Sequence, residues 1–428
     1  MSGPAPGDLP GSDLPGSDLP GSDLPGSDLP GSDLLGEARA LLPDTVALRR
    51  ALHRHPEVGL QLPRTQRAVL AALADLGLPA RTGTAVSSVV ARLDGARPGP
   101  TVLLRADMDA LPLREDTGLD FASEVDGAMH ACGHDTHVAM LLGAARLLAA
   151  HRADLAGRVV LMFQPGEEGH HGARAMLDEG LLAHAADGAG PVEAGFALHI
   201  STRYPSGTVN LRPGPMMAAG DRLRITVRGR GGHASAPHLA LDPVPVACEL
   251  VLALQTLVTR RVDAVEPVVV TVGRISAGTT HNVIPDTAEL HGTIRTLSEP
   301  TRRALRGWLT RAAEGIAAAH GAAAEVEIED GYPVTVNHPD AAERLRRVAA
   351  ELVGQERVTQ LAEPLLGSED FSYVLQQVPG AIAFLGACRP GRDPATEPSN
   401  HSSQVVFDES ALPVGVATYA ALALRRPG

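Results

Sequence analysis

The chain contains no lysine, only three cysteines and few aromatic residues, which make up 3% of its 428 residues. The missing lysine reflects genomic base composition rather than function. Three cysteines in so long a chain argue against a disulfide framework. No uninterrupted apolar run reaches the roughly 18 residues of a membrane span, and the N-terminus lacks a basic and then apolar secretion signal. We therefore expect a cytoplasmic protein without a membrane partner.

Positive charge is also in short supply, because the formal net charge is −13. An acidic balance of this size disfavours nucleic acid as a partner, since phosphate backbones are bound by basic surfaces. Hydrophobic residues nevertheless make up 44% of the chain, as in an ordinary globular protein. A chain of this length has room for two or three domains with a sizeable core.

The N-terminal segment, residues 1–36, repeats the pentamer Pro-Gly-Ser-Asp-Leu. Proline and glycine in every unit prevent a continuous helix or sheet ladder, so we predict a disordered acidic tail. The remaining chain divides by pattern into a catalytic domain (37–214 and 331–428) and an inserted domain (215–330).

In the first part of the catalytic domain, helix-like and strand-like segments alternate. We expect helices over 37–55, 64–76 and 136–150, and strands over 88–93, 101–105, 159–163 and 194–200. This alternation predicts an α/β domain with a mostly parallel sheet. Ligands of such sheets collect beyond the strand ends, where the chemically informative residues of this chain fall.

The inserted domain has a different pattern. We expect strands over 221–228, 268–275, 287–296 and 324–329, with helices over 243–262 and 301–320. The order β-α-β-β-α-β is that of a ferredoxin-like α+β unit. Trp308, the single tryptophan, falls in the second helix, and we expect it in the core.

The stretch Met129–His137 places one thiol and three imidazoles within nine residues. Thiolate and imidazole are ligands of zinc and similar divalent metals. Glu167 and Glu168 follow a short apolar strand about thirty residues later. Neighbouring residues of an extended chain point in opposite directions, so one carboxylate can bind metal while the other serves as a base. Together these residues predict a metal-dependent hydrolase.

Four further residues are uninformative when each is taken alone. His199 is expected at the end of an apolar strand, where a lone histidine is more often a core residue. His401 lies in a polar loop. Asp107 and Asp109 follow a strand, where they could bind a metal, orient a metal-bound histidine or form an edge turn.

Six motifs together resemble the dinuclear-metal amidohydrolases that include hippurate hydrolases, N-acyl-amino-acid amidohydrolases and plant auxin-conjugate hydrolases. The resemblance extends from about Leu48 to Leu412. The motifs are Arg-Ala-Asp-Met-Asp-Ala-Leu-Pro (105–112), Met-His-Ala-Cys-Gly-His-Asp-x-His (129–137), Gln-Pro-Gly-Glu-Glu-Gly (164–169), Gly-Gly-His-Ala-Ser-Ala-Pro-His (231–238), His-Asn-Val-Ile-Pro (281–285) and Gly-Ser-Glu-Asp-Phe-Ser (367–372).

The resemblance implies a zinc-peptidase-like catalytic domain with an inserted lid and dimerisation domain, and a site for two divalent ions (Mn, Zn, Co or Ni). The implied metal ligands are Cys132, His134, Glu168, His199 and His401, with Cys132 bridging the two ions. Glu167 is the implied general base. Asp107 and Asp109 would support the ligands from behind.

The resemblance also assigns residues of the inserted domain. His233 would reach the active site of a neighbouring subunit and take part in catalysis and substrate binding. Asn282 would hold the substrate carboxylate. A homodimer through this domain is the implied assembly. His170 and His171, next to the glutamates, could contact substrate or lie on the surface.

The expected reaction is cleavage of an N-acyl amino acid, such as an N-acetyl or hippurate-like compound, into a carboxylate and a free amino acid. A dipeptidase or aminopeptidase of the same fold is one alternative. A non-catalytic amino-acid-binding protein on the same scaffold is another, although the complete set of ligands and base argues against it.

Overall fold

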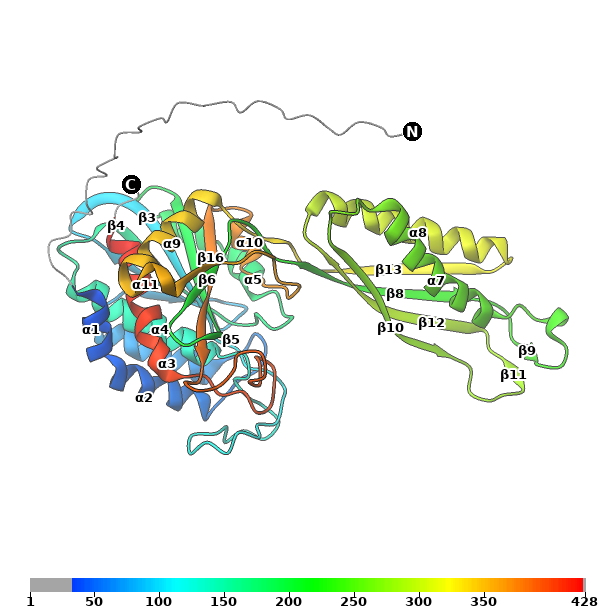
Figure 1. Ribbon diagram of the computed structural model, residues 1–428, viewed down its shortest axis with the longest axis horizontal. Coiled ribbons are helices and arrows are strands. Elements are labelled where there is room, and N and C mark those ends of the chain that lie inside the picture. Colours follow the sequence, from blue (N-terminus) through cyan, green and yellow to red (C-terminus); the bar gives the residue numbers. More distant parts are fainter. Residues whose placement is uncertain (1–32, 426–428) are drawn as a thin grey trace, which may run out of the picture. The chain divides into compact units, whose positions relative to one another are not determined.

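The computed structural model describes residues 33–425 (Figure 1). The predicted repeat tail falls outside the described residues except at its end. There the structure corrects the boundary at residue 36, because helix α1 (Leu34–Ala40) begins at Leu34 and the Asp33 side chain caps it through the Gly36 N–H at 2.8 Å.

One helix was expected over 37–55, and the chain forms two. Helix α1 ends at Ala40, and α2 (Leu42–His53) begins two residues later with Pro43 in its first turn. Proline has no N–H to donate to the preceding turn, so it ends one helix and starts the next. Helix α3 (Pro63–Asp75) also starts on a proline and matches its predicted range closely.

The main sheet has eight strands with a parallel centre, which confirms the predicted α/β class. Strand β3 pairs in parallel with β4 and β5, and β5 pairs in parallel with β16. The spatial order is β1 (Ala80–Thr82), β2 (Val89–Asp94), β4 (Ala156–Gln164), β3 (Arg97–Asp107), β5 (Val192–Pro205), β16 (Gly380–Cys388), β6 (Val209–Leu211) and β15 (Val358–Gln360).

Helices cover this sheet (Figure 1). Helix α4 (His134–Ala150) packs on β3 and β5 and against α11 (Leu412–Leu424), whose side chains are all buried. A second apolar cluster joins the sheet to α5 (Gly172–Asp178), α6 (Leu181–Ala186) and α10 (Ser372–Leu375). Helix α9 (Pro339–Val353) packs on β16. Both faces of the central strands are therefore buried, as their continuous apolar runs predict.

A separate four-stranded antiparallel sheet is formed by residues 219–332. Its spatial order is β10 (Val268–Ala277), β12 (Thr287–Thr296), β8 (Ala219–Arg228) and β13 (Ala323–Tyr332). Helices α7 (Pro243–Arg261) and α8 (Glu299–Ala319) pack on this sheet and share an apolar core with it. Trp308, which was expected in the core, is partly buried and packs against this core. Chain order and strand order are those of a ferredoxin-like unit.

Helix α7 passes the length and composition test for a membrane span, which the absence of an uninterrupted apolar run did not lead us to expect. The test is weak for a single helix, because core helices of globular proteins also pass it. Val246, Leu250 and Leu254 of α7 are buried in the core of the second sheet. One face of α7 is therefore a core face.

Two short strand pairs complete the described fold. Strand β9 (Gly232–His233) pairs with β11 (Val283–Ile284), and β7 (Gly214–Met217) pairs with β14 (Thr335–Asn337). The first pair carries two motifs singled out in the sequence. The second lies where the chain enters and leaves the second sheet.

Candidate metal centre

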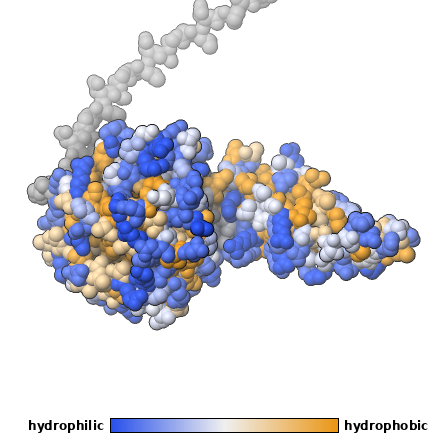
Figure 2. Space-filling view, turned by 90° about the horizontal axis from the view of Figure 1, so that it is seen from below, coloured by the Kyte–Doolittle hydropathy of each residue, from blue (hydrophilic) through white to orange (hydrophobic). Residues whose placement is uncertain are grey.

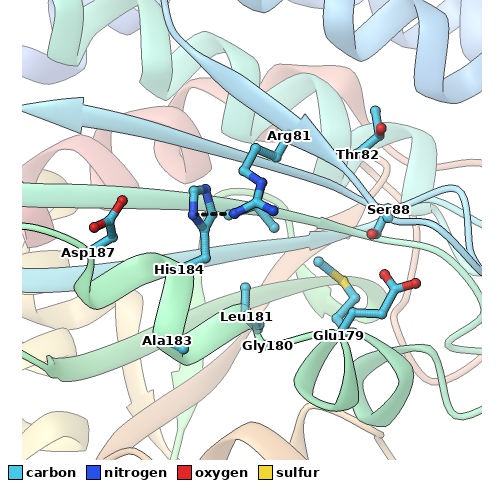
Figure 3. Close-up of a pocket in the computed structure, with 12 residues that line it drawn as sticks. Arg81, Thr82, Ser88, Glu179, Gly180, Leu181, Ala183, His184 and Asp187 are labelled. Atoms are coloured by element: carbon cyan, nitrogen blue, oxygen red, sulfur yellow. Dashed lines mark hydrogen bonds between the residues drawn. The ribbon is translucent and has the colours of Figure 1, made fainter.

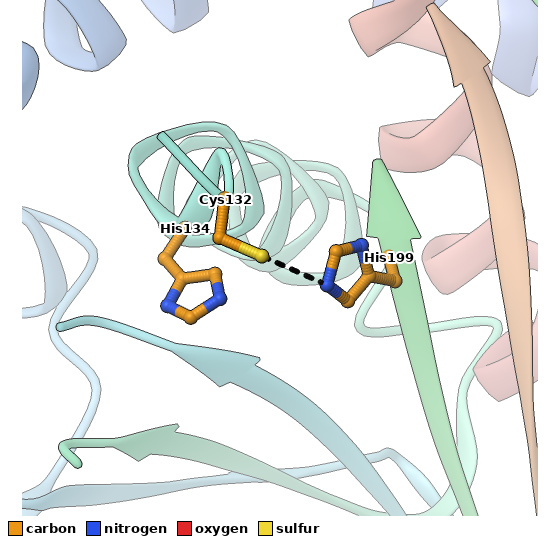
Figure 4. A group of neighbouring side chains, drawn as sticks. All are labelled: Cys132, His134 and His199. Carbon is orange, nitrogen blue, oxygen red and sulfur yellow. Dashed lines mark hydrogen bonds between the residues drawn. The ribbon is translucent and has the colours of Figure 1, made fainter. Parts of the chain in front are cut away.

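Cys132 and His134 stand at the start of α4, on either side of Gly133. Gly133 has a φ of +84°, a left-handed conformation that glycine adopts without strain. A Cβ there would collide with the Ile200 side chain and approach the Phe407 ring to 3.0 Å. Only glycine fits at this turn, and the turn presents the thiol and the imidazole on the same side of the helix start (Figure 4).

Donor atoms from distant parts of the chain meet around the Cys132 thiol. One set consists of Cys132, His134 and His199, and a second of Cys132, Glu168 and His401; within each set the ligand atoms lie within 4.8 Å of one another. The Cys132 Sγ is 3.4 Å from His199 Nε2 and 3.2 Å from His401 Nε2. Both sets share the thiol. The structure thus brings all five predicted ligands together.

Hydrogen bonds hold the ring of His199 and the backbone of His401 in place. His199 lies inside β5 rather than at a strand end as expected, because β5 continues to Pro205. Its Nδ1 donates to the Ile200 carbonyl at 2.8 Å, which leaves the Nε2 lone pair toward Cys132. His401 has a φ of +70°, a strained conformation for a non-glycine residue, and its N–H donates to the Ala131 carbonyl.

Neither ring nitrogen of His137 is free to bind a metal. Its Nδ1 donates to Asp107 Oδ1 at 2.5 Å, and its Nε2 accepts the Ile200 N–H at 2.8 Å. Asp107 also lies 2.6 Å from the Arg105 guanidinium. Asp107 therefore ties β3 to the first turn of α4 from behind the candidate ligands, as the sequence led us to expect.

The two glutamates lie in a turn after β4, not in an extended strand end, so the expectation of opposite directions is wrong. Both line one cavity of about 430 Å³. Both glutamates form a donor group with His134; Glu168 also belongs to the set with Cys132 and His401, whereas Glu167 also lies among Glu369 and Asp370. Asp109 holds the turn by accepting the Glu167 and Glu168 N–H groups at 2.9 Å each.

Burial and neighbouring charge shift the pKa values of these side chains. Burial, followed by the charges of Glu369 and Glu168, raises the pKa of Glu167 well above its usual range. Burial also raises the pKa of the Cys132 thiol. Hydrogen bonds to Cys132 and Glu168 raise the pKa of His401 to about 10. Glu168 has a lowered pKa: burial opposes this, but the His401 hydrogen bond and charge outweigh it.

Unsatisfied donor atoms test whether these residues suit a metal. Both ring nitrogens of His134 are buried and have no hydrogen-bond partner among residues 33–425. A buried polar atom without a partner is costly, and a bound cation removes that cost. Thiolate, imidazole and carboxylate donors suit a borderline divalent ion. The residues therefore fit the metal site that the resemblance implies.

Residues of the β9–β11 pair do not reach this cavity. His233 and Asn282 are exposed and are absent from its lining, although the Ala234 N–H donates to the Asn282 carbonyl and so joins the two motifs. The two histidines after the glutamates differ in position: His171 lines the cavity, whereas His170 is exposed. A single chain thus assembles the predicted ligands and base without the two predicted residues of the inserted domain.

Some residues of the site carry no local sequence signal for their position. Arg295 of β12 and Tyr332 of β13 line the cavity, although each is far from the ligands in sequence. Glu369 and Asp370 lie in a motif quoted above, but their contact with Glu167 and with the buried Arg105 is a matter of tertiary folding.

Another cavity, of about 440 Å³, opens beside β1, β2, α5 and α6 (Figure 3). Arg81 donates there to His184 Nδ1 at 3.0 Å. None of the metal-ligating groups found in the described part of the chain contains a residue of this cavity. The chemistry therefore belongs to the cavity at Cys132.

Fold and site together define a hydrolase of amide bonds with a metal-ligating centre. The model of Peptidase family M20/M25/M40 matches residues 103–425, and the chain belongs to this family.

Relatives and solved structures agree with this assignment. The chain is 40% identical over 384 residues to thermostable carboxypeptidase 1 of Saccharolobus solfataricus, covering 89% of this chain and 94% of that protein. It is 38% identical over 385 residues to the N-acetylcysteine deacetylase of Bacillus subtilis, covering 89% and 96%. The YXEP protein of Bacillus subtilis, described as a dinuclear metal binding peptidase, superposes with a TM-score of 0.77 at 35% identity, covering 90% and 98%.

Proposed function

We propose that the protein is a metal-dependent amidohydrolase that cleaves N-acyl amino acids into a carboxylate and a free amino acid. The carrying observation is the overlap of two donor sets at Cys132, with Glu167 beside them in the same cavity. Similarity to a deacetylase of an N-acetylated amino acid supports this substrate class. A reaction that depends on a thiolate ligand suits the reducing cytoplasm, where we propose that the protein acts.

Two divalent ions are the proposed cofactor, and Cys132, His134, Glu168, His199 and His401 would hold them. When bound, such ions supply Lewis acidity, which polarises the substrate carbonyl and acidifies water. Mn, Zn, Co and Ni all accept this mixture of sulfur, nitrogen and oxygen donors.

Glu167 is the proposed general base. Its carboxylate takes a proton from the water that attacks the amide carbon, and the same carboxyl then gives this proton to the leaving nitrogen as the C–N bond breaks. Burial and the carboxylates around it raise its pKa well above its usual range, and a carboxyl that holds a proton more firmly can return it to the leaving nitrogen.

Arg295 is the proposed partner of the substrate carboxylate within the same chain. It lines the cavity, and its one side-chain hydrogen bond within the described chain goes to the Ile294 carbonyl at 3.3 Å. Burial lowers the pKa of Arg295, and Asp221, the one charge that opposes this shift, is already paired with Arg302 at 2.6 Å. A guanidinium without an anionic partner, facing a cavity, is suited to bind a substrate carboxylate in two hydrogen bonds.

A homodimer through the second sheet is the proposed assembly, with His233 acting at the partner's site and Asn282 holding substrate. Strand β10 is an edge strand, paired with β12 alone within the described chain. Apolar side chains are exposed near it, including Ile275 (51%) of β10 and Leu252 (71%) of α7. Figure 2 shows hydrophobic surface on the part of the molecule that holds this sheet. An open edge beside apolar surface favours pairing with a second copy.

Peptide cleavage is the second candidate, favoured by the similarity to a carboxypeptidase. The two functions differ in the group on the carbonyl side of the cleaved amide bond. This group is a simple acyl group in an N-acyl amino acid and an amino-acid residue in a peptide. Amino-acid release from N-acetyl, N-benzoyl and indole-acetyl amino acids should be compared with release from free dipeptides and N-blocked dipeptides. Preference for the simple acylated substrates supports the proposal; cleavage of peptides alone would replace it.

A further inference from the structure

The hydroxyl of Tyr332 meets the turn that carries the candidate base. Tyr332 is the last residue of β13, and its side chain is largely buried at 8% exposure. The hydroxyl donates to the carbonyl oxygen of Glu167 and accepts the Gly169 N–H at 2.6 Å. One side chain from the second sheet thus contacts two backbone groups that flank Glu168.

The opposite side of the same turn is held by Asp109. Its two carboxylate oxygens accept the N–H groups of Glu167 and Glu168. The turn belongs to neither helix nor strand. Within it the Gly169 N–H also donates to the Glu167 carbonyl at 2.7 Å, and the Gly172 N–H donates to the Gly166 carbonyl at 3.0 Å. Asp109, just after β3, and Tyr332, at the end of β13, add side-chain hydrogen bonds from two sides and leave both glutamate side chains free to face the cavity.

The surroundings of Tyr332 keep its hydroxyl in place. The ring packs edge-on against the His171 imidazole with centroids 5.0 Å apart, and the Tyr373 ring lies 6.2 Å away. Burial, followed by the charges of Asp370 and Glu167, raises the pKa of Tyr332, so the phenol stays protonated and able to donate. Tyr373 accepts or donates to His171 Nδ1 at 2.9 Å and donates to the Gly331 carbonyl, but it does not bond the glutamate turn.

We propose that Tyr332 is a positioning residue for the reaction: through its hydroxyl it fixes the backbone of Glu167 and Gly169, and so sets where the base meets the attacking water. This inference rests on the proposed function of Glu167. A base displaced by a fraction of an ångström still lets substrate bind but catalyses more slowly, because proton transfer needs near-attack geometry. The expected signature is therefore a loss in kcat with KM retained.

The test compares Tyr332→Phe with Tyr373→Phe and the unaltered protein, each loaded with Mn or Zn and assayed on an N-acetyl amino acid. Both substitutions remove one hydroxyl from the same aromatic cluster. We expect kcat of Tyr332→Phe to fall about 10- to 100-fold while KM, metal content and inhibition by the product amino acid change less than about twofold. Tyr373→Phe should keep kcat within about threefold, since it does not touch the turn.

Hydrogen exchange supplies a second readout that needs no catalysis. Peptides spanning residues 165–172 should exchange faster in Tyr332→Phe than in the unaltered protein or Tyr373→Phe, because the Gly169 N–H loses one of its two acceptors and the Glu167 carbonyl loses the phenol that donates to it.

An unchanged kcat in Tyr332→Phe, an equal loss of kcat in Tyr373→Phe, or unaltered exchange of residues 165–172 in Tyr332→Phe would each contradict the inference. A loss of metal or of product affinity together with kcat would point to general disruption of the cavity and also overturn the positioning role. If the unaltered, metal-loaded protein releases no amino acid, the proposed function fails, and the exchange result still decides the contact.

Discussion

Cys132 is the residue on which two sets of donor atoms converge, and Glu167 is the carboxylate beside them that neither set needs as a ligand. The two adjacent glutamates share one donor group with His134, but Glu168 also joins Cys132 and His401, whereas Glu167 also joins Glu369 and Asp370. The proposed roles of ligand and base rest on these different electrostatic surroundings.

Replacing Glu167 with glutamine should lower kcat at least about 100-fold, because the amide cannot take the proton from water. Metal content should stay unchanged, since the ligand sets remain complete. Steady-state kinetics with metal analysis checks this, and Glu343→Gln, on the exposed face of α9, is the matched control. Undiminished turnover of the metal-loaded variant would remove Glu167 from the reaction.

Replacing Arg295 with methionine should raise KM about 10- to 100-fold, because a charge-assisted hydrogen bond to the substrate carboxylate is lost. The effect should disappear for an N-acyl amino acid amide, which has no carboxylate. Arg228→Met is the control, since Arg228 lies on the same sheet and already pairs with Glu325 at 2.6 Å. Equal KM increases on both substrates would show that Arg295 does not bind the carboxylate.

At the scale of elements, the entrance to the second sheet is held by an ion pair. Asp221 at the start of β8 accepts two hydrogen bonds from Arg302 of α8, at 2.6 and 2.9 Å, and a third from the Gly331 N–H. Burial alone would raise the pKa of Asp221, but these hydrogen bonds and the Arg302 charge lower it overall. The contact joins β8, α8 and the end of β13.

Asp221→Asn should lower the free energy of unfolding by about 1.5–3 kcal/mol at pH 7, the cost of hydrogen bonds to a charged group. Because the folded pKa of Asp221 is depressed, its stabilisation is complete above the unfolded pKa of about 3.9 and is lost as the pH falls through the folded value. The difference between the two proteins should therefore shrink below about pH 4. Denaturant unfolding at several pH values measures this, with exposed Asp187→Asn as control. A difference that is constant with pH would rule out the ion pair as its source.

Helices and strands were predictable from sequence wherever apolar periodicity was strong. They were less predictable where a single residue decides where an element begins or ends. The range of β12 (Thr287–Thr296) was predicted in full, and α7 to within one residue. The helix break before Pro43, the extension of β5 beyond His199 and the turn at Glu167 were missed. Each depends on a capping group or a neighbouring strand rather than on local pattern.

The site shows the same limit. The motifs contain three of the five proposed ligands and the proposed base, whereas His199, inside β5, and His401, in a loop, lie in none of them. Arg295 and Tyr332 were not predicted as site residues, because they join the cavity only when β12 and β13 fold beside the glutamate turn. Sequence spacing does not encode that proximity.

For the whole molecule, the open edge of β10 leads to a prediction about assembly. The protein should sediment as a dimer of 44.4 kDa chains, and Ile275→Glu should shift it to the monomer by placing a charge at the paired edge. Val58→Glu, at an exposed apolar residue of the first part of the chain, is the control. A monomeric unaltered protein at micromolar concentration would contradict the proposed dimer and the role of His233 in a partner's site.

Metal-dependent release of an amino acid from an N-acylated substrate tests the proposed function most directly. Release from N-acetylmethionine would be followed before chelation, after chelation and after re-addition of Mn, Zn, Co or Ni. We predict that chelation abolishes release and that at least one of these ions restores it. Release that continues unchanged in the chelated, metal-free protein would contradict a metal centre at Cys132 as the site of reaction.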